Sequence, residues 1–160
     1  MKRKLILALV ASISFSFASH AQNTDSLHLS FCDAVKYLIK DCIATHFKSI
    51  KGKDMNYVAY ESKLKVEGFT NEQITSLGSF EALYEKTAVS ADEISAMVDQ
   101  LSKQVAECTG FSPFIFKEKG LKNSLLEDDK ASGLKAKIMI SSEKVSKREY
   151  TIKLVISAGG

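Results

Sequence analysis

The sequence predicts an α+β fold in which two helices pack on an antiparallel sheet. Two segments, 31–47 and 91–108, carry apolar residues at the spacing of an amphipathic helix. Segments 57–67, 134–140 and 150–156 instead alternate apolar and polar residues, as strands with one buried face do. The expected order is helix, three strands, helix and two or three strands, which suits helices layered on one sheet.

Residues 1–21 have the features of a secretory signal peptide. The basic residues Lys2–Lys4 precede an apolar stretch, 5–17, and Ser19 and Ala21 form a small-residue cleavage site. The apolar stretch is shorter than the roughly 20 residues of a membrane-spanning helix. We therefore expect a periplasmic or secreted product with no membrane insertion after cleavage.

The remaining chain is long enough for one domain. We expect 22–30 to be a mobile N-terminal arm and 31–160 to be a single α+β domain. The full chain has 22 basic and 19 acidic residues, and cleavage would remove three basic ones, leaving 19 of each sign. This balance argues against a nucleic-acid partner. The sequence contains no phosphate-binding glycine loop or G-x-S-x-G motif, and we expect no cofactor.

Capping signals mark where both helices begin. Ser30 and Ser90 stand before the first turn of each, with Asp33 and Glu93 three residues later. Gly110 follows the second helix, where a C-terminal glycine is common. These signals make the second helix the firmest element of the prediction.

The segment between the two helices has a weaker pattern after residue 67. Residues 70–73 could start a short helix, but Gly78 and Ser79 between two apolar runs favour a hairpin. We therefore predict strands at 72–77 and 80–87.

After the second helix, 111–117 is predicted to add a short strand. The polar segment 118–133 is predicted to be a loop with one helical turn at 124–126. The last two strands should form a hairpin, and its final strand, 150–157, could lie at a sheet edge. Lysine and arginine residues near that edge would protect it, and we leave a dimer open.

The three cysteines suggest one disulfide and one free thiol in an exported protein. Cys32 and Cys42 are ten positions apart on one helix, about 15 Å, which is too far for a bond. Cys42 and Cys108 lie near the C-terminal ends of their helices, and those ends are neighbours if three strands separate the helices. We therefore predict a Cys42–Cys108 disulfide, with two buried free thiols as the alternative.

Cys42 and His46 are one helical turn apart, which is a spacing that metal ligands use. A zinc site needs three or four ligands, so we predict no metal site. The position of His46 near the helix C-terminus has a structural explanation in the helix dipole.

Aromatic residues cluster after the second helix, and we expect most of them to fill the core. If one or two remain exposed, they would form an interaction patch. The residues of this candidate patch are Phe111, Phe114, Phe116, Tyr57 and Met139.

Three segments carry a resemblance to a known group: Phe47–Gly52, Tyr60–Leu64 and Cys108 at the end of the second helix. The chain resembles small exported Bacteroidetes proteins of unknown function, whose layout is similar to that of class I type III secretion chaperones. The chain has no room for the closing helix of those chaperones, which are cytoplasmic and usually acidic. The resemblance therefore implies a fold and no activity.

The leading hypothesis is a non-enzymatic exported binding or accessory protein that uses one sheet face or edge to recognise a protein or peptide. One alternative is a small exported hydrolase or thiol enzyme using Cys32 or Cys42 with His46. A second alternative is an immunity or inhibitor protein against a secreted toxin.

Overall fold

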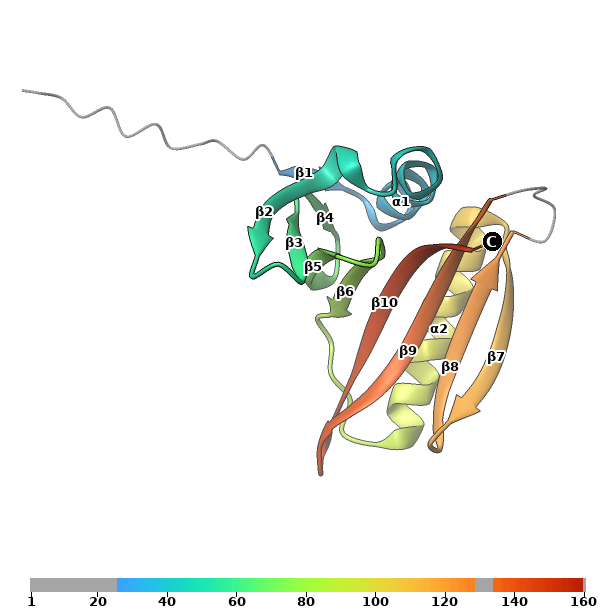
Figure 1. Ribbon diagram of the computed structural model, residues 1–160. Helices are drawn as coiled ribbons and strands as arrows, with labels where there is room; N and C mark the ends of the chain where they lie inside the picture. The colour runs from blue at the N-terminus through green and yellow to red at the C-terminus, as the bar shows by residue number, and fades with distance from the viewer. Residues whose placement is uncertain (1–25, 129–133, 160) are drawn as a thin grey trace, which may run out of the picture.

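The computed structural model describes residues 26–128 and 134–159, so the predicted signal peptide lies outside the described residues. It has the α+β class that the sequence predicts, with two long helices and a large, mostly antiparallel sheet (Figure 1). In chain order the elements are β1 (Leu27–Leu29), α1 (Phe31–Thr45), the 3-10 helix η1 (Lys48–Ile50), β2 (Lys51–Met55), β3 (Ala59–Ser62), β4 (Leu64–Val66), β5 (Phe69–Thr75), β6 (Phe80–Tyr84), α2 (Ala91–Thr109), β7 (Ser112–Glu118), β8 (Leu121–Glu127), β9 (Lys135–Ser146) and β10 (Glu149–Gly159).

Both helices begin at the serines that the sequence indicates. The Ser30 hydroxyl accepts the N–H of Asp33 at 3.4 Å, and the Ser90 hydroxyl accepts the N–H of Glu93 at 3.1 Å. Gly110 ends α2 with φ 75°, a left-handed conformation that glycine adopts without steric cost. The predicted helices are thus confirmed to within two residues at each end.

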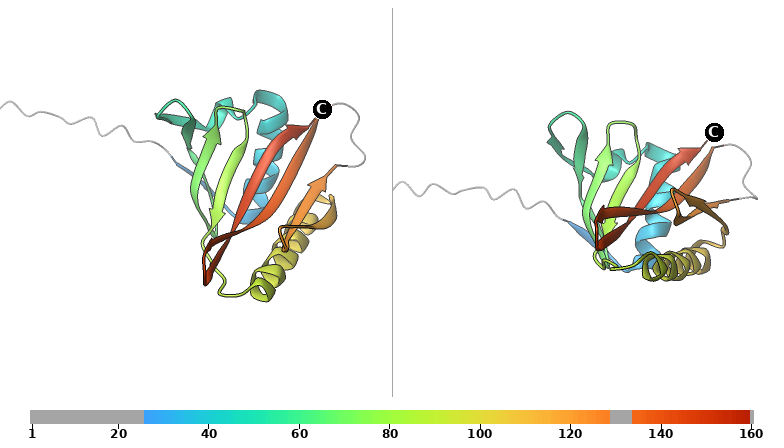
Figure 2. Two further views of the ribbon diagram at one scale, coloured as in Figure 1. Left: turned by 60° about the horizontal axis from the view of Figure 1, so that its bottom comes forward. Right: turned by 90° about the horizontal axis from the view of Figure 1, so that it is seen from below.

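The eight-stranded sheet has the order β2-β3-β5-β6-β10-β9-β8-β7. Both helices pack on one face of it, and the left view of Figure 2 shows α1 behind the strands and α2 below them. Side chains aligned across the middle strands on that face are almost fully buried: Leu126, Ile138, Ile156, Phe80 and Ile74. A buried hydrogen bond of 2.7 Å between Ser102 of α2 and Ser124 of β8 fixes the same face against the helix. In the described part of the chain, no helix covers the opposite face.

The N-terminal half differs from the prediction in three places. Residues 27–29 of the predicted mobile arm form β1, which pairs in parallel with β4. The predicted strand 57–67 is broken at Lys63 into β3 and β4, because β4 leaves the large sheet to pair with β1. The segment before it contains β2, a strand that the sequence pattern did not predict. The hairpin predicted around Gly78 is confirmed as β5 and β6.

The C-terminal half contains one more strand than predicted. The segment 118–133 was predicted as a loop with a helical turn at 124–126, and this is wrong because residues 121–127 form β8. The final hairpin is confirmed as β9 and β10. However, β10 lies between β6 and β9 in the middle of the sheet, so the prediction of a protected C-terminal edge is also wrong.

Candidate functional site

The strand β7 forms one edge of the large sheet and pairs only with β8 among the described residues. The two strands are joined by a two-residue turn at Lys119 and Gly120, whose φ angles of 50° and 81° are those of a type I′ turn. In such a turn the flanking residues, Glu118 and Leu121, form a hydrogen-bonded pair.

The type of turn determines which peptide groups of β7 point away from the sheet. Hydrogen-bonded and non-hydrogen-bonded pairs alternate along an antiparallel ladder. Counting back from Glu118, the main chains of Phe116 and Phe114 bond to β8, and those of Lys117, Ile115 and Pro113 point outward. Proline has no N–H to donate, so Pro113 occupies the kind of edge position that tolerates it. Ile115 and Lys117 therefore present a main-chain donor and acceptor each at the open edge.

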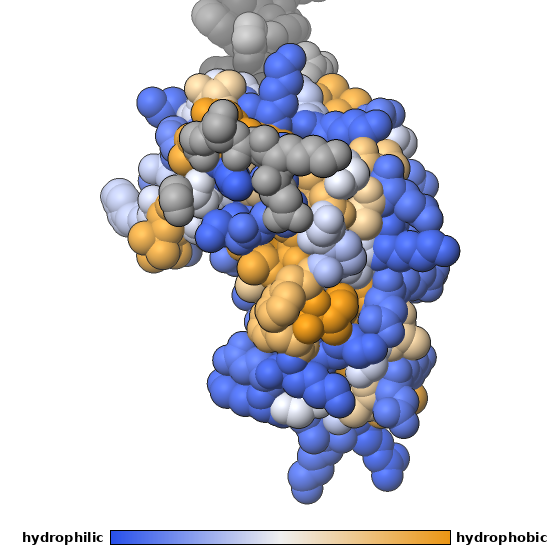
Figure 3. Space-filling model, turned by 90° about the vertical axis from the view of Figure 1, so that its right-hand side faces the viewer, coloured by the Kyte–Doolittle hydropathy of each residue, from blue (hydrophilic) through white to orange (hydrophobic). Residues whose placement is uncertain are grey.

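The side chains of β7 give this edge an apolar surface. Phe114 is 65% exposed and Ile115 is 42% exposed. The rings of Phe114 and Phe116 stack with centroids 6.1 Å apart on the sheet face that the helices leave uncovered. Leu125, Met139 and Val155 continue the row from Phe114 across the neighbouring strands, each partly buried. Figure 3 shows an apolar patch on the side of the molecule that carries β7. We call these five residues (Phe114, Phe116, Leu125, Met139 and Val155) the β7 patch.

The other edge of the same sheet is built differently. The strand β2 carries Lys51, Lys53 and Asp54, and its register with β3 shifts between Lys51 and Asp54. Charged side chains and irregular pairing are the usual protection of a sheet edge against another chain. From Ser112 to Phe116, β7 has no charged residue. The sheet thus has one edge that is protected from pairing, at β2, and one apolar edge, at β7. We call the edge at β2 the guarded edge.

The structure brings together only part of the patch predicted from the sequence. Phe114, Phe116 and Met139 lie in the β7 patch. Phe111 is partly buried and packs against the core, as most of these aromatic residues were expected to do. Tyr57 is 91% exposed, but it lies in the turn between β2 and β3 at the opposite end of the sheet. The prediction that Tyr57 belongs to this patch is therefore wrong. The sequence reasoning missed Leu125 because β8 was predicted as a loop.

The disulfide joins Cys32 to Cys108, with a Cα–Cα distance of 5.2 Å, and Cys42 is free. The predicted Cys42–Cys108 bond is therefore wrong. That prediction assumed three sheet strands between the helices, which would bring their C-terminal ends together. Because β4 pairs with β1 outside the large sheet, four strands of that sheet lie between the helices, namely β2, β3, β5 and β6. The start of α1 consequently lies beside the end of α2.

The surroundings of Cys42 do not activate its thiol. The side chain is fully buried, and burial together with the negative charge of Asp41 raises its pKa from 9.0 to about 11. Such a thiol is protonated at neutral pH, whereas a nucleophilic cysteine needs a lowered pKa. His46 is exposed and caps α1 with its backbone. Within residues 26–128 and 134–159, no three His, Cys, Asp or Glu side chains are grouped as metal ligands.

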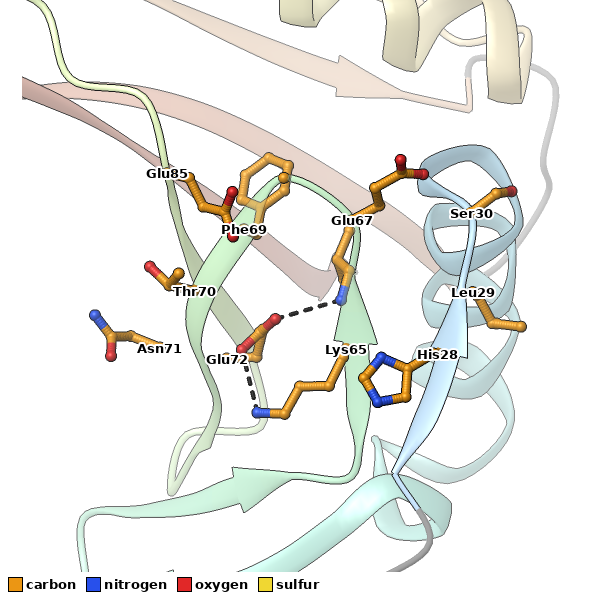
Figure 4. Close-up of a pocket in the computed structure, with 12 residues that line it drawn as sticks. His28, Leu29, Ser30, Lys65, Glu67, Phe69, Thr70, Asn71, Glu72 and Glu85 are labelled. Carbon is orange, nitrogen blue, oxygen red and sulfur yellow. Dashed lines mark hydrogen bonds and ion pairs between the residues drawn. The ribbon is translucent and has the colours of Figure 1, made fainter.

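A groove of about 780 Å³ lies where β1 and β4 meet β5 (Figure 4). The backbone of β5 bulges at Asn71, with φ 53° and a register shift between Thr70 and Gln73. Glu72 is thereby directed inward, where it is 6% exposed. One of its oxygens accepts from the Lys65 ammonium at 3.2 Å and the other from the Val66 N–H at 3.3 Å. Both oxygens of this carboxylate are engaged in holding β4 against β5, which is a structural role.

Comparisons with known proteins add no family to this description. No family model, no curated protein and no solved structure matches the chain. Among the described residues, neither helix is long and apolar enough to cross a membrane. Since these comparisons indicate no function, the β7 patch and the open edge beside it are the features of the molecule that point to one.

Proposed function

We propose that this chain is a non-enzymatic binding protein that adds an extended segment of a protein or peptide partner to β7. The observation that carries the proposal is the contrast between the two edges of the sheet. The edge at β2 is charged and irregular, whereas β7 is regular, uncharged from Ser112 to Phe116, and open along its outer side.

Two kinds of contact would hold such a segment. The outward main-chain groups of Ile115 and Lys117 can exchange hydrogen bonds with an added strand, which gives affinity for any extended backbone. The β7 patch lies beside them and favours apolar side chains at alternate positions of the added strand. The partner segment is therefore expected to be extended, with aromatic or β-branched residues on one face.

The disulfide supports an oxidising location for this binding. Disulfides persist in secreted and periplasmic proteins and are rare in the bacterial cytosol. Cys32 and Cys108 are bonded, and the N-terminal segment has the pattern of a signal peptide. We infer that the partner is met in the periplasm or outside the cell.

The experiment is selection from a displayed library of extended peptides, followed by binding measurements with the variants Ile115→Pro and Met55→Lys. Pro at position 115 removes an outward N–H that β8 does not use, so it should abolish peptide binding and leave the fold intact. Met55→Lys changes the guarded edge and should leave binding unchanged.

Hydrogen exchange gives an independent measurement on the unsubstituted protein. The amides of Ile115 and Lys117 should become protected when a selected peptide binds, because their N–H groups then donate to the added strand. A peptide that binds equally well to Ile115→Pro, or that protects neither amide, would contradict the proposal.

A further inference from the structure

We propose that, in the free protein, β7 pairs antiparallel with β7 of a second copy about a two-fold axis at Ile115. This inference rests on the proposed function, because it assigns a specific occupant to the same open edge. It follows from the self-complementary pattern of outward peptide groups and side chains along residues 113–117.

The outward main-chain groups match when Ile115 faces Ile115 of the second copy. The two residues then exchange a pair of hydrogen bonds, as facing residues do in an antiparallel ladder. Two positions away, the Lys117 N–H donates to the carbonyl of Pro113 from the second copy. By symmetry, the Lys117 N–H of the second copy donates to the carbonyl of Pro113 in the first. Pro113 has no N–H to donate to the Lys117 carbonyl, so the ladder ends there. The pairing is short and has four main-chain hydrogen bonds.

The side chains match in the same register. Phe114 of each copy lies opposite Phe116 of the other, as a non-hydrogen-bonded pair with Cα atoms about 4.5 Å apart. The stacked rings already present in one chain, 6.1 Å apart, would then join into a cluster of four rings across the axis. Aromatic pairs across strands stabilise a sheet. At the ends, Ser112 faces Glu118, so the register opposes no like charges.

The guarded edge explains why the association should stop at two copies. Pairing of β7 with β2 of another molecule would leave free edges at both ends and would extend into a fibre. The charges and the register shift of β2 oppose that pairing. Pairing of β7 with itself uses the same surface on both copies and is closed. It joins two eight-stranded sheets into one continuous sheet with both β7 patches on it.

The test has two parts, of which the first is sedimentation of the full mature chain over a concentration series. We expect the mass to rise toward two chains with increasing concentration. Ile115→Pro should remain at one chain and Met55→Lys should dimerise like the unsubstituted protein. Circular dichroism of Ile115→Pro checks that its fold is unchanged.

The second part uses an introduced cysteine at the proposed axis. Facing residues of a hydrogen-bonded pair have Cα atoms about 5.5 Å apart, which lies within the range of a disulfide. Ile115→Cys should therefore form a cross-linked dimer under mild oxidation. Leu77→Cys is the matched control, because Leu77 is apolar and 95% exposed in the turn between β5 and β6. We expect Ile115→Cys to cross-link at least about tenfold faster, because pairing raises its effective concentration.

The outcomes separate this inference from the proposed function. Equal cross-linking of the two cysteine variants, or one-chain mass at every concentration, would overturn the pairing of two copies. If the monomeric protein still binds selected peptides at β7, the proposed function stands alone. If the protein dimerises through Ile115 but binds no displayed peptide when diluted to monomers, the inference stands and the peptide-binding proposal fails.

Discussion

Removal of the disulfide should cost a large part of the stability of this domain. Cys32 and Cys108 are separated by 76 residues, so the bond closes a long loop in the unfolded chain. The chain-entropy relation gives about 15 cal/mol/K for a loop of that length, which is about 4.5 kcal/mol at 25 °C. The net stability of a small domain is commonly about 5 to 15 kcal/mol. For a domain of this size, the melting temperature should fall by roughly 10 to 20 °C.

The assay is thermal and urea unfolding of Cys32→Ser, Cys108→Ser and the double variant, with and without a reducing agent. Each substitution breaks the same bond, so the two single variants and the double variant should lose similar amounts. Reduction should destabilise the unsubstituted protein by a similar amount and have little effect on the variants. Additive losses from the two single variants, or a loss below about 1 kcal/mol on reduction, would refute the loop-entropy reasoning.

Three further predictions concern single sites. Because burial holds the pKa of Cys42 near 11 while the unfolded thiol ionises near 9.0, stability should fall between those pH values by up to about 2 to 3 kcal/mol. Unfolding of Cys42→Ala over the same pH range should lack this component. Ser90→Ala removes the cap on the Glu93 N–H and should cost about 1 kcal/mol by urea unfolding, whereas a cost near zero would contradict it. Ser102→Ala leaves the buried hydroxyl of Ser124 without its partner and should cost about 1 to 3 kcal/mol, while replacing both serines by alanine should cost less than the sum of the single changes.

Local patterns were sufficient to predict the helices and two of the hairpins. Ser90, Glu93 and Gly110 mark the ends of α2 through contacts with the nearest residues of the chain. The alternation of apolar and polar residues in β9 and β10 likewise indicates, from neighbouring positions alone, that one face is buried and the other is more exposed. Such elements are predictable because their determinants lie within a few positions of each other.

The errors arose where distant segments decide the outcome. The residues of β8 include Asn123 and Ser124, which are polar but buried, and their burial depends on Ser142 and Ser102 from other elements. Their polarity therefore suggested a loop. The turn at Lys119 and Gly120 was the local signal that could have indicated this hairpin.

The cysteine pairing and the candidate site depended on the order of the strands. Because β4 leaves the large sheet, the relative direction of the two helices changes. No pattern within residues 64–66 indicates that β4 pairs outside that sheet. The same order places Met139 beside Phe114 through β8 and separates both from Tyr57. The aromatic cluster could therefore be found from the sequence, while its neighbours on the sheet could not.

The central position of β10 also affects the time at which the fold can be completed. Residues 149–159 are synthesised after the seven other strands of the described sheet, yet they connect β6 to β9. Until they are available, β6 has a free edge, and the strands before and after α2 belong to separate partial sheets. Closing contacts between residues distant in sequence is slow, and free strand edges on incomplete chains promote aggregation. A nascent or translocating chain that stops before Glu149 should therefore depend on a chaperone or be degraded, even though it already contains both helices and both cysteines of the disulfide.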